Sequence, residues 1–273
     1  MNKQAILLSA VILIGAATLA QAQEDPLGVT LDATWVSKYL WYGIDKLDDK
    51  AAFQPSVDVD LFGSGFSINV WASYPTAAGD MNKGGGSAGT SRIDATEYDY
   101  TVAYSTVFCE GDPQETAVTA HGRYYDFIDQ ADTVGDAHEV GMQIAMPELT
   151  GVGVVPSYFV GRIWPARSNS DLGGNYAGWV HIFGLGYDLE LPGLSPDTPE
   201  QVVSFSAAAV YNDGFAGGGV DHDWSHGLFG VSTSFELAEN VHLTPAFYYQ
   251  SSWEDTVNPE DEMIFSIGAS CKF

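Results

Sequence analysis

The sequence predicts an all-β fold: an antiparallel transmembrane β-barrel of about twelve strands, with short periplasmic turns and longer external loops. Three observations lead to this prediction. Apolar and polar residues alternate with a period of two along almost the whole chain, as in strands with two different faces. The alternating runs are mostly about ten residues long, which is the length a tilted strand needs to cross a bilayer. The links between the runs alternate between short and long.

Residues 1–22 have the features of a secretory signal peptide. Lys3 provides a basic start, an apolar run covers residues 5–19, and a small-x-small sequence ends at Ala22. The apolar run is shorter than the roughly 20 residues of a membrane-spanning helix, so cleavage is favoured over an N-terminal anchor. We therefore expect cleavage near Ala22, a mature barrel domain of residues 23–273, and localisation in the outer membrane of a Gram-negative bacterium.

The chain is strongly acidic, with 36 Asp and Glu against 10 Lys and Arg and a net charge of −26. Loss of Lys3 with the signal peptide would lower this by one, to −27. Such a surface repels nucleic acid and anionic lipid, so neither is an expected partner. Aromatic residues make up 13% of the chain, whereas disordered acidic proteins contain few of them. The composition therefore indicates a folded protein.

Four strands are predicted in the first part of the chain, at residues 28–36, 55–62, 65–74 and 97–108. In the first of them, Val29, Leu31 and Trp35 fall on one face, and Thr30 and Asp32 fall on the other. The apolar face of each run is expected to contact lipid, and the polar face to line the interior. Further strands are predicted at residues 115–127, 138–146, 152–164, 177–190, 202–212, 225–237, 241–253 and 262–273.

The links and the aromatic residues predict which end of the barrel is external. Short links follow the second, fourth, sixth and tenth strands, and longer polar links follow the odd-numbered strands. The link after the eighth strand is an exception, at ten residues. Tryptophan is typical of the membrane–water interface, and five tryptophans lie at the ends with long links: Trp41, Trp164, Trp179, Trp224 and Trp253.

Two prolines, Pro156 and Pro245, fall inside predicted strands. Proline has no N–H to donate to a β-ladder, and a closed barrel has no free edge strand where this missing donor could be tolerated. Both residues lie near the periplasmic ends of their strands. We expect β-bulges to accommodate them there.

The last predicted strand, residues 262–273, alternates up to the final residue. It must pair with the first strand to close the barrel, so a shift by one residue would turn its polar side chains to lipid. The terminal Phe273 resembles the C-terminal signal by which the barrel-assembly machinery recognises outer-membrane proteins. This resemblance implies that machinery as a partner, and Phe265, Ile267 and Phe273 as the assembly signal.

The N-terminal part of the chain is similar to the TorF-type porin family of Gram-negative bacteria. The similar stretches are SKYLWYGI, QPSVDV, GFSINVWASY and EYDYTVAYS, within roughly residues 29–105, together with the last strand. Members open with a Ser-x-Tyr-x-x-x-Gly stretch, matched by Ser37, Tyr39 and Gly43. Members often have Arg before that glycine, where this chain has Tyr42, and the loops differ. The resemblance implies a barrel with a pore, and no particular substrate.

The segment DHDWSH, residues 221–226, contains the residue types of a nucleophilic site. Sequence neighbours on a glycine-rich loop rarely adopt the geometry of a catalytic triad, so a solvated loop is favoured. Metal binding by His222 and His226 is a minority interpretation, since closed metal sites need ligands on rigid elements. We predict no catalytic residue, no metal site and no cofactor, and we do not expect an enzyme.

Two clusters of acidic residues in predicted loops offer the oxygen ligands that Ca²⁺ prefers. Neither cluster matches the calcium-loop pattern, so hydrated surface charge is the favoured interpretation. Cys109 and Cys271 fall on opposite parities of strands that are not expected to be adjacent, which disfavours a disulfide. The acidic clusters are Asp45, Asp48 and Asp49, and Asp129, Asp132 and Asp136.

The inward-facing parity carries more acids than bases. In a narrow lumen, such charge concentrates cations and repels anions. The sequence therefore predicts a narrow porin-like channel for small hydrophilic solutes, with a preference for cations. The main alternative is an outer-membrane barrel without a conducting pore, structural or enzymatic; a secreted ligand-binding β-sandwich is a more distant one. The predicted pore-lining residues are Asp32, Asp58, Asp60, Glu97, Asp99, Arg123, Glu139, Asp188 and Glu190.

Overall fold

A computed structural model describes residues 27–76, 96–128, 136–166, 177–192, 201–215 and 222–273. The predicted signal peptide and its cleavage site at Ala22 lie outside these residues, as does most of the link after the eighth barrel strand. Within the described ranges, no helix has the length and hydrophobicity that a membrane crossing needs.

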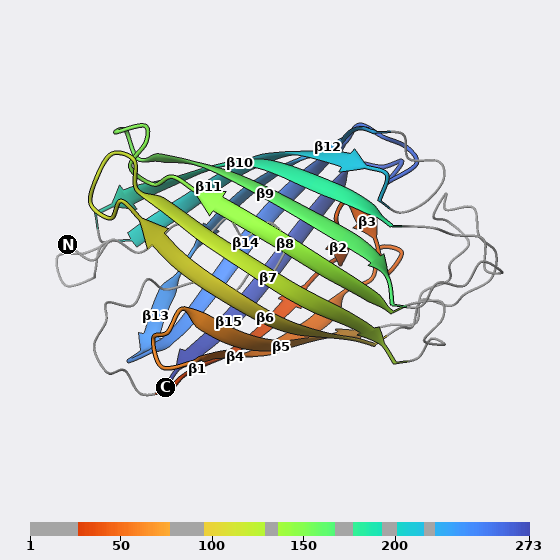
Figure 1. The fold of residues 1–273 in the computed structure, drawn as a ribbon. Helices are drawn as coiled ribbons and strands as arrows, with labels where there is room; N and C mark the ends of the chain where they lie inside the picture. Colours follow the sequence, from red (N-terminus) through yellow and green to blue (C-terminus); the bar gives the residue numbers. More distant parts are fainter. Residues whose placement is uncertain (1–26, 77–95, 129–135, 167–176, 193–200, 216–221) are drawn as a thin grey trace.

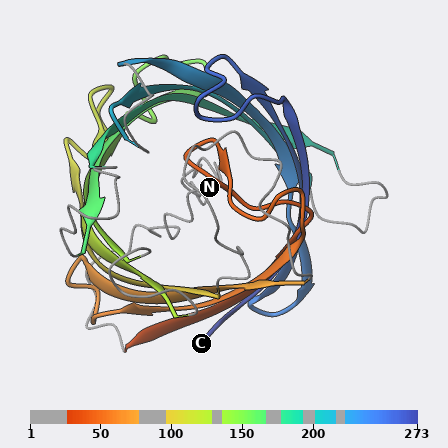
Figure 2. The same cartoon turned by 90° about the vertical axis from the view of Figure 1, so that its right-hand side faces the viewer.

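The described residues form a closed, antiparallel barrel (Figures 1 and 2). β12 and β13 both pair with β14, one after the other, so twelve strands surround the barrel in the described part of the chain. β1 pairs with β4 and with β15, and this second ladder closes the sheet. The predicted fold class is therefore confirmed. The barrel strands are β1 (Gly28–Val36), β4 (Ala52–Asp60), β5 (Phe66–Pro75), β6 (Glu97–Phe108), β7 (Thr116–Phe127), β8 (Ala137–Ala145), β9 (Val154–Pro165), β10 (Gly178–Leu191), β11 (Gln201–Asp213), β12 (Asp223–Thr233), β13 (Phe235–Ala238), β14 (Val241–Ser252) and β15 (Glu262–Lys272).

Short and long links lie at opposite ends of the barrel, as predicted. The end that holds the C-terminus in Figure 1, here called the inner end, carries the short links 61–65, 109–115, 146–153 and 239–240. The opposite end, here called the outer end, carries the longer links. Cys109 lies exposed in one inner turn, Cys271 lies on β15, and both are free.

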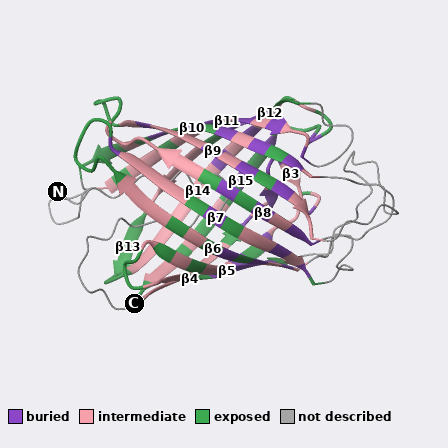
Figure 3. Cartoon of the chain, in the orientation of Figure 1, coloured by how far each residue is buried: buried purple, intermediate pink, exposed green. Residues whose placement is uncertain are grey.

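The outer surface of the barrel is apolar, and most strands alternate between exposed and covered side chains (Figure 3). On β15, Met263, Phe265 and Ile267 are 61%, 56% and 52% exposed, whereas Ile264 is fully buried inside. In a bilayer, this exposed apolar band faces lipid instead of water. The predicted register of the last strand is confirmed, with Ile267 opposite Trp35 of β1.

The two prolines are accommodated without the bulges that the sequence suggested, so that prediction was wrong. The pairing of β9 with β10 runs through Pro156 without a register shift, and the Pro156 carbonyl accepts from Met146 N, just beyond the end of β8. Pro245, on β14, lies opposite the gap between β12 and β13. The pairing of β14 with β12 ends at Ala246, and its pairing with β13 begins at Leu243. In both cases the missing N–H falls where a ladder ends.

The link between β1 and β4 folds into the barrel. It contains the short strands β2 (Leu40–Trp41) and β3 (Ile44–Asp45), and Figure 2 shows this orange segment inside the ring of strands. We call residues 37–51 the inserted hairpin. Its Leu40 and Tyr42 pack with wall residues such as Phe159, Ile182 and Ile264 in one buried cluster. The hydrophobic core therefore lies inside the outer half of the barrel.

Candidate functional site

The inserted hairpin is shaped by residues with unusual backbone angles. Tyr42 and Gly43 form its tip, with φ angles of 48° and 90°. A Cβ atom on residue 43 would lie 2.6 Å from two ring atoms of His226 on β12, so only glycine allows this close approach. The Gly43 carbonyl accepts a hydrogen bond from Gln250 Nε2 of β14, at 3.0 Å. The tip is therefore held against β12 and β14.

Glu139, on β8, is the main polar anchor of the hairpin. Its side chain is 1% exposed and binds three partners. Tyr42 OH donates to Oε2 at 2.7 Å, and Tyr125 OH donates to the same oxygen at 2.6 Å. His121 Nε2 lies 2.6 Å from Oε1. Such a buried carboxylate needs this dense set of donors to offset the loss of hydration.

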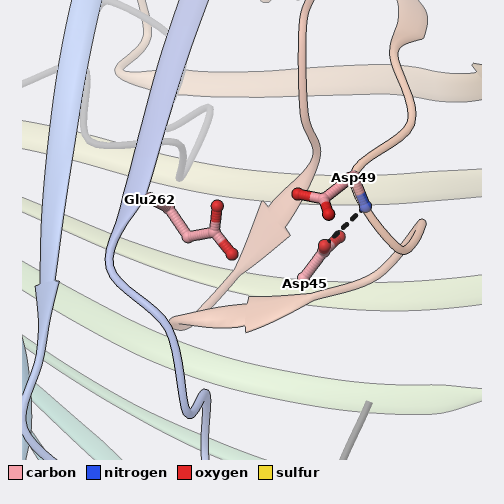
Figure 4. Close-up of side chains that lie close together, drawn as sticks. All are labelled: Asp45, Asp49 and Glu262. Carbon is pink, nitrogen blue, oxygen red and sulfur yellow. Dashed lines mark hydrogen bonds between the residues drawn. The ribbon is translucent and has the colours of Figure 1, made fainter. Parts of the chain in front are cut away.

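A second anchor lies at the base of the hairpin. The Lys38 ammonium forms ion pairs with Asp49 of the hairpin and with Glu262 of β15. Figure 4 shows the carboxylates of Asp45, Asp49 and Glu262 close together, within 4.8 Å of one another. Asp45 also accepts from the backbone N–H groups of Leu47 and Asp49, at 3.0 and 2.7 Å. The lysine pairs with two of the three carboxylates, so we assign this cluster a structural role.

Lys46 extends from the hairpin toward the opposite wall. Its ammonium lies 4.6 Å from the ring centroid of Trp41 and 4.4 Å from that of Phe127, both cation–π contacts. Burial lowers the pKa of Lys46, while the negative charges of Glu97 and Asp99 act in the opposite direction. The hairpin thus brings a base to the acidic face of β6.

Four of the nine predicted lining residues come together around the hairpin in the outer half of the barrel: Glu97, Asp99, Arg123 and Glu139. Arg123 donates to Thr101 Oγ1 at 3.0 Å and to Tyr125 OH at 3.4 Å, and its guanidinium lies 4.0 Å from Asp99 Oδ2. Within this group three acids stand against one base, Arg123, and the basic side chains of Lys46 and His121 lie close by. The network is part of the packed interior, and its members Asp99 and Arg123 also line a cavity described below.

The other five predicted residues lie toward the inner end and remain more accessible. Asp32 lies opposite Ser270 of β15, and Asp58 lies opposite Thr30 of β1. Asp60 accepts from the Gly63 N–H at 2.8 Å and so also supports the first inner turn. Asp188 and Glu190 alternate with the exposed Leu189 and Leu191 of β10, which places both acids on the lumen side. A role for these five residues in lining a pore stays a prediction.

Two cavities flank the hairpin. The first, here called the polar cavity, contains about 450 Å³ of unfilled space, part of it open to solvent. The second, here called the apolar cavity, lies on the opposite side of Tyr42, against β10–β15, and includes Ile182, Val210 and Leu228. The hairpin thus separates a polar face of the lumen from an apolar one. The polar cavity is lined by Tyr39, Trp41, Tyr42, Gln54, Asn69, Trp71, Asp99, Thr101, Arg123 and Tyr125.

The hairpin is the part of the site that the sequence patterns missed. Trp41 was assigned to the external interface belt, and this was wrong. Its ring centroid lies inside the lumen, 5.2 Å from that of Tyr125 and 5.0 Å from that of Phe215. Trp179, Trp224 and Trp253 are 42%, 44% and 50% exposed and fit the predicted belt. A signal was present: SKYLWYGI is too rich in aromatic residues for a solvated loop.

Within the DHDWSH segment, Ser225 and His226 are in contact, whereas His222 points elsewhere; Asp221 lies outside the described residues. His222 is exposed and pairs with Asp213. Ser225 is fully buried; its Oγ lies 2.9 Å from His226 Nδ1 and 3.2 Å from the Val210 carbonyl, to which it donates. A hydroxyl enclosed in this way cannot reach a substrate, and the two histidines are not oriented toward one ion.

The second acidic cluster is described only in part. Asp129 and Asp132 lie outside the described residues. Asp136 is buried and accepts from Tyr124 OH at 2.7 Å and from Phe127 N at 3.1 Å. It therefore joins the ends of β7 and β8 instead of facing solvent as hydrated charge.

The fold and the lipid-facing surface define the class of protein: a transmembrane β-barrel of the outer-membrane type. No protein-family model matches the chain, and no curated protein matches it significantly in sequence. The fold is similar to that of a KdgM porin solved in complex with disordered oligogalacturonate, at 7% identity and a TM-score of 0.52, covering 89% of this chain and 99% of that chain.

Two further solved barrels have the same fold. The NanC porin is 10% identical at a TM-score of 0.50, covering 90% of this chain and 100% of that one. The COG4313 outer membrane channel from Pseudomonas putida F1 is 10% identical at a TM-score of 0.52, covering 91% and 96%. At such identities the likeness concerns the fold alone. The resemblance to TorF-type porins stays a prediction.

Proposed function

We propose that the protein is an outer-membrane channel for passive diffusion of small hydrophilic solutes, with a preference for cations. The shared fold with porins supports the channel function. A twelve-stranded barrel encloses more space than an eight-stranded one, whose side chains fill the interior, and less than a 16-stranded porin. Outer-membrane lipid and the barrel-assembly machinery are the partners that such a barrel requires, and no catalytic role is assigned.

The observation that supports cation preference is the distribution of charge along the lumen. In the outer half, the bases Arg123 and Lys46 lie close to the acids Asp99 and Glu97. Toward the inner end, the five accessible acids stand against Lys272, which is exposed at the rim. An excess of fixed negative charge in a confined lumen raises the local concentration of cations. We infer that the inner half of the lumen selects solutes by charge, and that the outer half limits the size of the solutes that pass.

The test is a reversal potential measured across a salt gradient, with the refolded protein in a planar bilayer. We expect the wild type to favour cations, and the double change Asp58→Asn and Asp60→Asn to reduce this preference, most strongly at low salt, where screening is weakest. Glu110→Gln, in an exposed inner turn, is the matched control and should leave selectivity unchanged. An anion-selective wild type would refute the proposal.

A barrel without a conducting pore is the second candidate, and the inserted hairpin is the observation that favours it. The hairpin packs against an apolar wall and is anchored at Glu139, Gln250 and Glu262. If this packing is permanent, no discrete conductance steps will appear in the bilayer. The other alternative, a secreted β-sandwich, was wrong, because the sheet closes on itself.

A further inference from the structure

The polar cavity contains buried polar atoms that have no hydrogen-bond partner. These atoms are Trp41 Nε1 and Trp71 Nε1, which are donors, and Asp99 Oδ1, which is an acceptor. Trp71 is 5% exposed and Asp99 is 6% exposed. The three residues come from the hairpin, β5 and β6, and all three line this one cavity. Buried polar atoms are normally paired with protein, water or a ligand, so three unpaired atoms around one cavity mark where a bound group would attach.

The chemistry of the three atoms restricts what that group is. An indole N–H only donates, and a carboxylate oxygen only accepts. An anion would satisfy both indoles and would pair with Arg123, but it offers no donor to Asp99 Oδ1. A metal cation would satisfy Asp99 but would leave both indoles unpaired. Hydroxyl groups donate and accept at once, so neighbouring hydroxyls on an uncharged molecule satisfy all three atoms.

The size and shape of the cavity agree with this chemistry. The cavity contains about 450 Å³ of unfilled space, part of it open to solvent, which lies in the range of pockets that hold small ligands. The rings of Tyr39 and Trp71, with centroids 5.7 Å apart and tilted by 54°, form an aromatic wall beside this space. Aromatic faces pack well against the C–H surfaces of a polyol, while its hydroxyls turn to the polar atoms.

We propose that the polar cavity is a binding subsite for an uncharged solute segment with two or three neighbouring hydroxyl groups, as in a polyol or a neutral sugar. This proposal rests on the channel function above and specifies a class of solute for it. The site lies at the level of the hairpin, where Arg123 and Lys46 face Asp99 and Glu97. Cations gather at the inner end, whereas a neutral hydroxylated solute binds at the constriction.

Binding is tested separately from conduction. Glycerol, glucose and gluconate are titrated onto the full mature chain, refolded in detergent micelles, and binding is followed by saturation-transfer NMR of each solute. We expect saturable signals for glycerol and glucose, and none for the anion gluconate. Trp71→Phe keeps an aromatic ring, though a smaller one, and removes the donor, so it should weaken glucose binding about ten-fold. Trp35→Phe, the same change on the lipid-facing surface, is the control.

The outcomes separate the two proposals. Saturable binding that Trp71→Phe weakens and Trp35→Phe leaves unchanged supports the subsite, even if no conductance is found and the channel proposal fails. Signals that do not saturate, or that are equal in wild type and Trp71→Phe, mean that the cavity holds water only and refute the subsite, whatever the conductance. If Trp71→Phe does not fold, Trp41→Phe makes the same test at the other donor.

Discussion

Glu139 is the residue on which most of the interior depends. It stands on β8, and its hydrogen bonds join this strand to two other parts of the protein: the hairpin through Tyr42, and β7 through Tyr125 and His121. A buried carboxylate is unfavourable unless such donors surround it, and truncating one donor leaves the others in place. Individual hydrogen bonds of this network can therefore be removed one at a time while Glu139 keeps its other partners.

The first prediction concerns Tyr42→Phe, which removes the bond from hairpin to Glu139 and keeps the aromatic packing. We expect the free energy of unfolding to fall by about 2 kcal/mol, because the acceptor is charged. The hairpin should also be held less firmly, and single-channel conductance should rise. Urea unfolding and bilayer recording measure the two effects. Tyr125→Phe, which removes a wall donor to the same oxygen, should destabilise without the change in conductance.

The second prediction concerns Lys38 and pH. Partial burial lowers the pKa of Lys38, but its hydrogen bonds and ion pairs with Asp49 and Glu262 outweigh this effect and raise the pKa above the ordinary 10.5. A raised pKa in the folded state means that the stabilisation is fully present below about pH 10.5 and is lost as the pH rises toward the folded value.

Lys38→Met keeps the length of the side chain and removes its charge. The difference in urea midpoint between wild type and this variant should be constant from pH 7 to 10 and should shrink above pH 10.5. A difference that does not change up to pH 12, or no difference at any pH, would show that the ion pairs do not hold the base of the hairpin.

At the scale of elements, β15 and the inserted hairpin follow different rules. β15 is specified by its own alternation, since each residue faces either lipid or lumen. Its neighbours β1 and β14 pair with it in the register that keeps the same faces toward lipid and lumen. The hairpin has no alternation, and its course is decided by partners on β7, β8, β12 and β14. Elements of the first kind are predictable from local sequence, and elements of the second kind are not.

The third prediction tests the lipid face of β15. Phe265→Asp together with Ile267→Asp places two carboxylates on a surface that is more than half exposed, where the bilayer cannot hydrate them. We expect little folded protein in the outer membrane. Ser266→Asp, on the inward parity of the same strand, is the control and should assemble normally. Removal of Phe273 should also reduce assembly if this residue belongs to the recognition signal.

At the scale of the whole molecule, closure is what makes the structure stable in a membrane. The ladder from β1 to β15 leaves no unpaired edge, so backbone N–H and C=O groups along the wall are paired without water. The apolar surface needs lipid or detergent, and the lumen carries the acids. The high net negative charge is therefore compatible with a membrane protein, because lipid-facing positions remain apolar.

The fourth prediction follows from this closure. The protein should be recovered in the outer-membrane fraction, and unboiled samples should migrate differently from boiled ones on a denaturing gel, because the closed barrel resists detergent until it is heated. The same band shift reports folding for all variants above. Recovery as a soluble periplasmic protein, with identical migration before and after heating, would contradict the membrane assignment.

The sequence by itself determined the barrel. Strand number, register, inside and outside faces and the positions of short turns are all encoded by alternation and by link length, because the bilayer imposes the same local requirement on every strand. For β15, from Met263 to Lys272, this requirement could be read from the strand's own sequence, without any other part of the chain. The two prolines were misjudged only in detail, since ladder ends depend on neighbouring strands.

The tertiary structure alone decided the interior. Whether Trp41 faces a membrane interface or a lumen depends on Tyr125 and Phe215, which are about 84 and 174 positions away along the chain. The pairing of Tyr42 with Glu139, and the three unpartnered atoms of the polar cavity, likewise join residues that no periodicity relates. Local patterns report on the solvent that each residue meets, whereas the lumen is filled by contacts between distant segments, and only the folded chain brings these together.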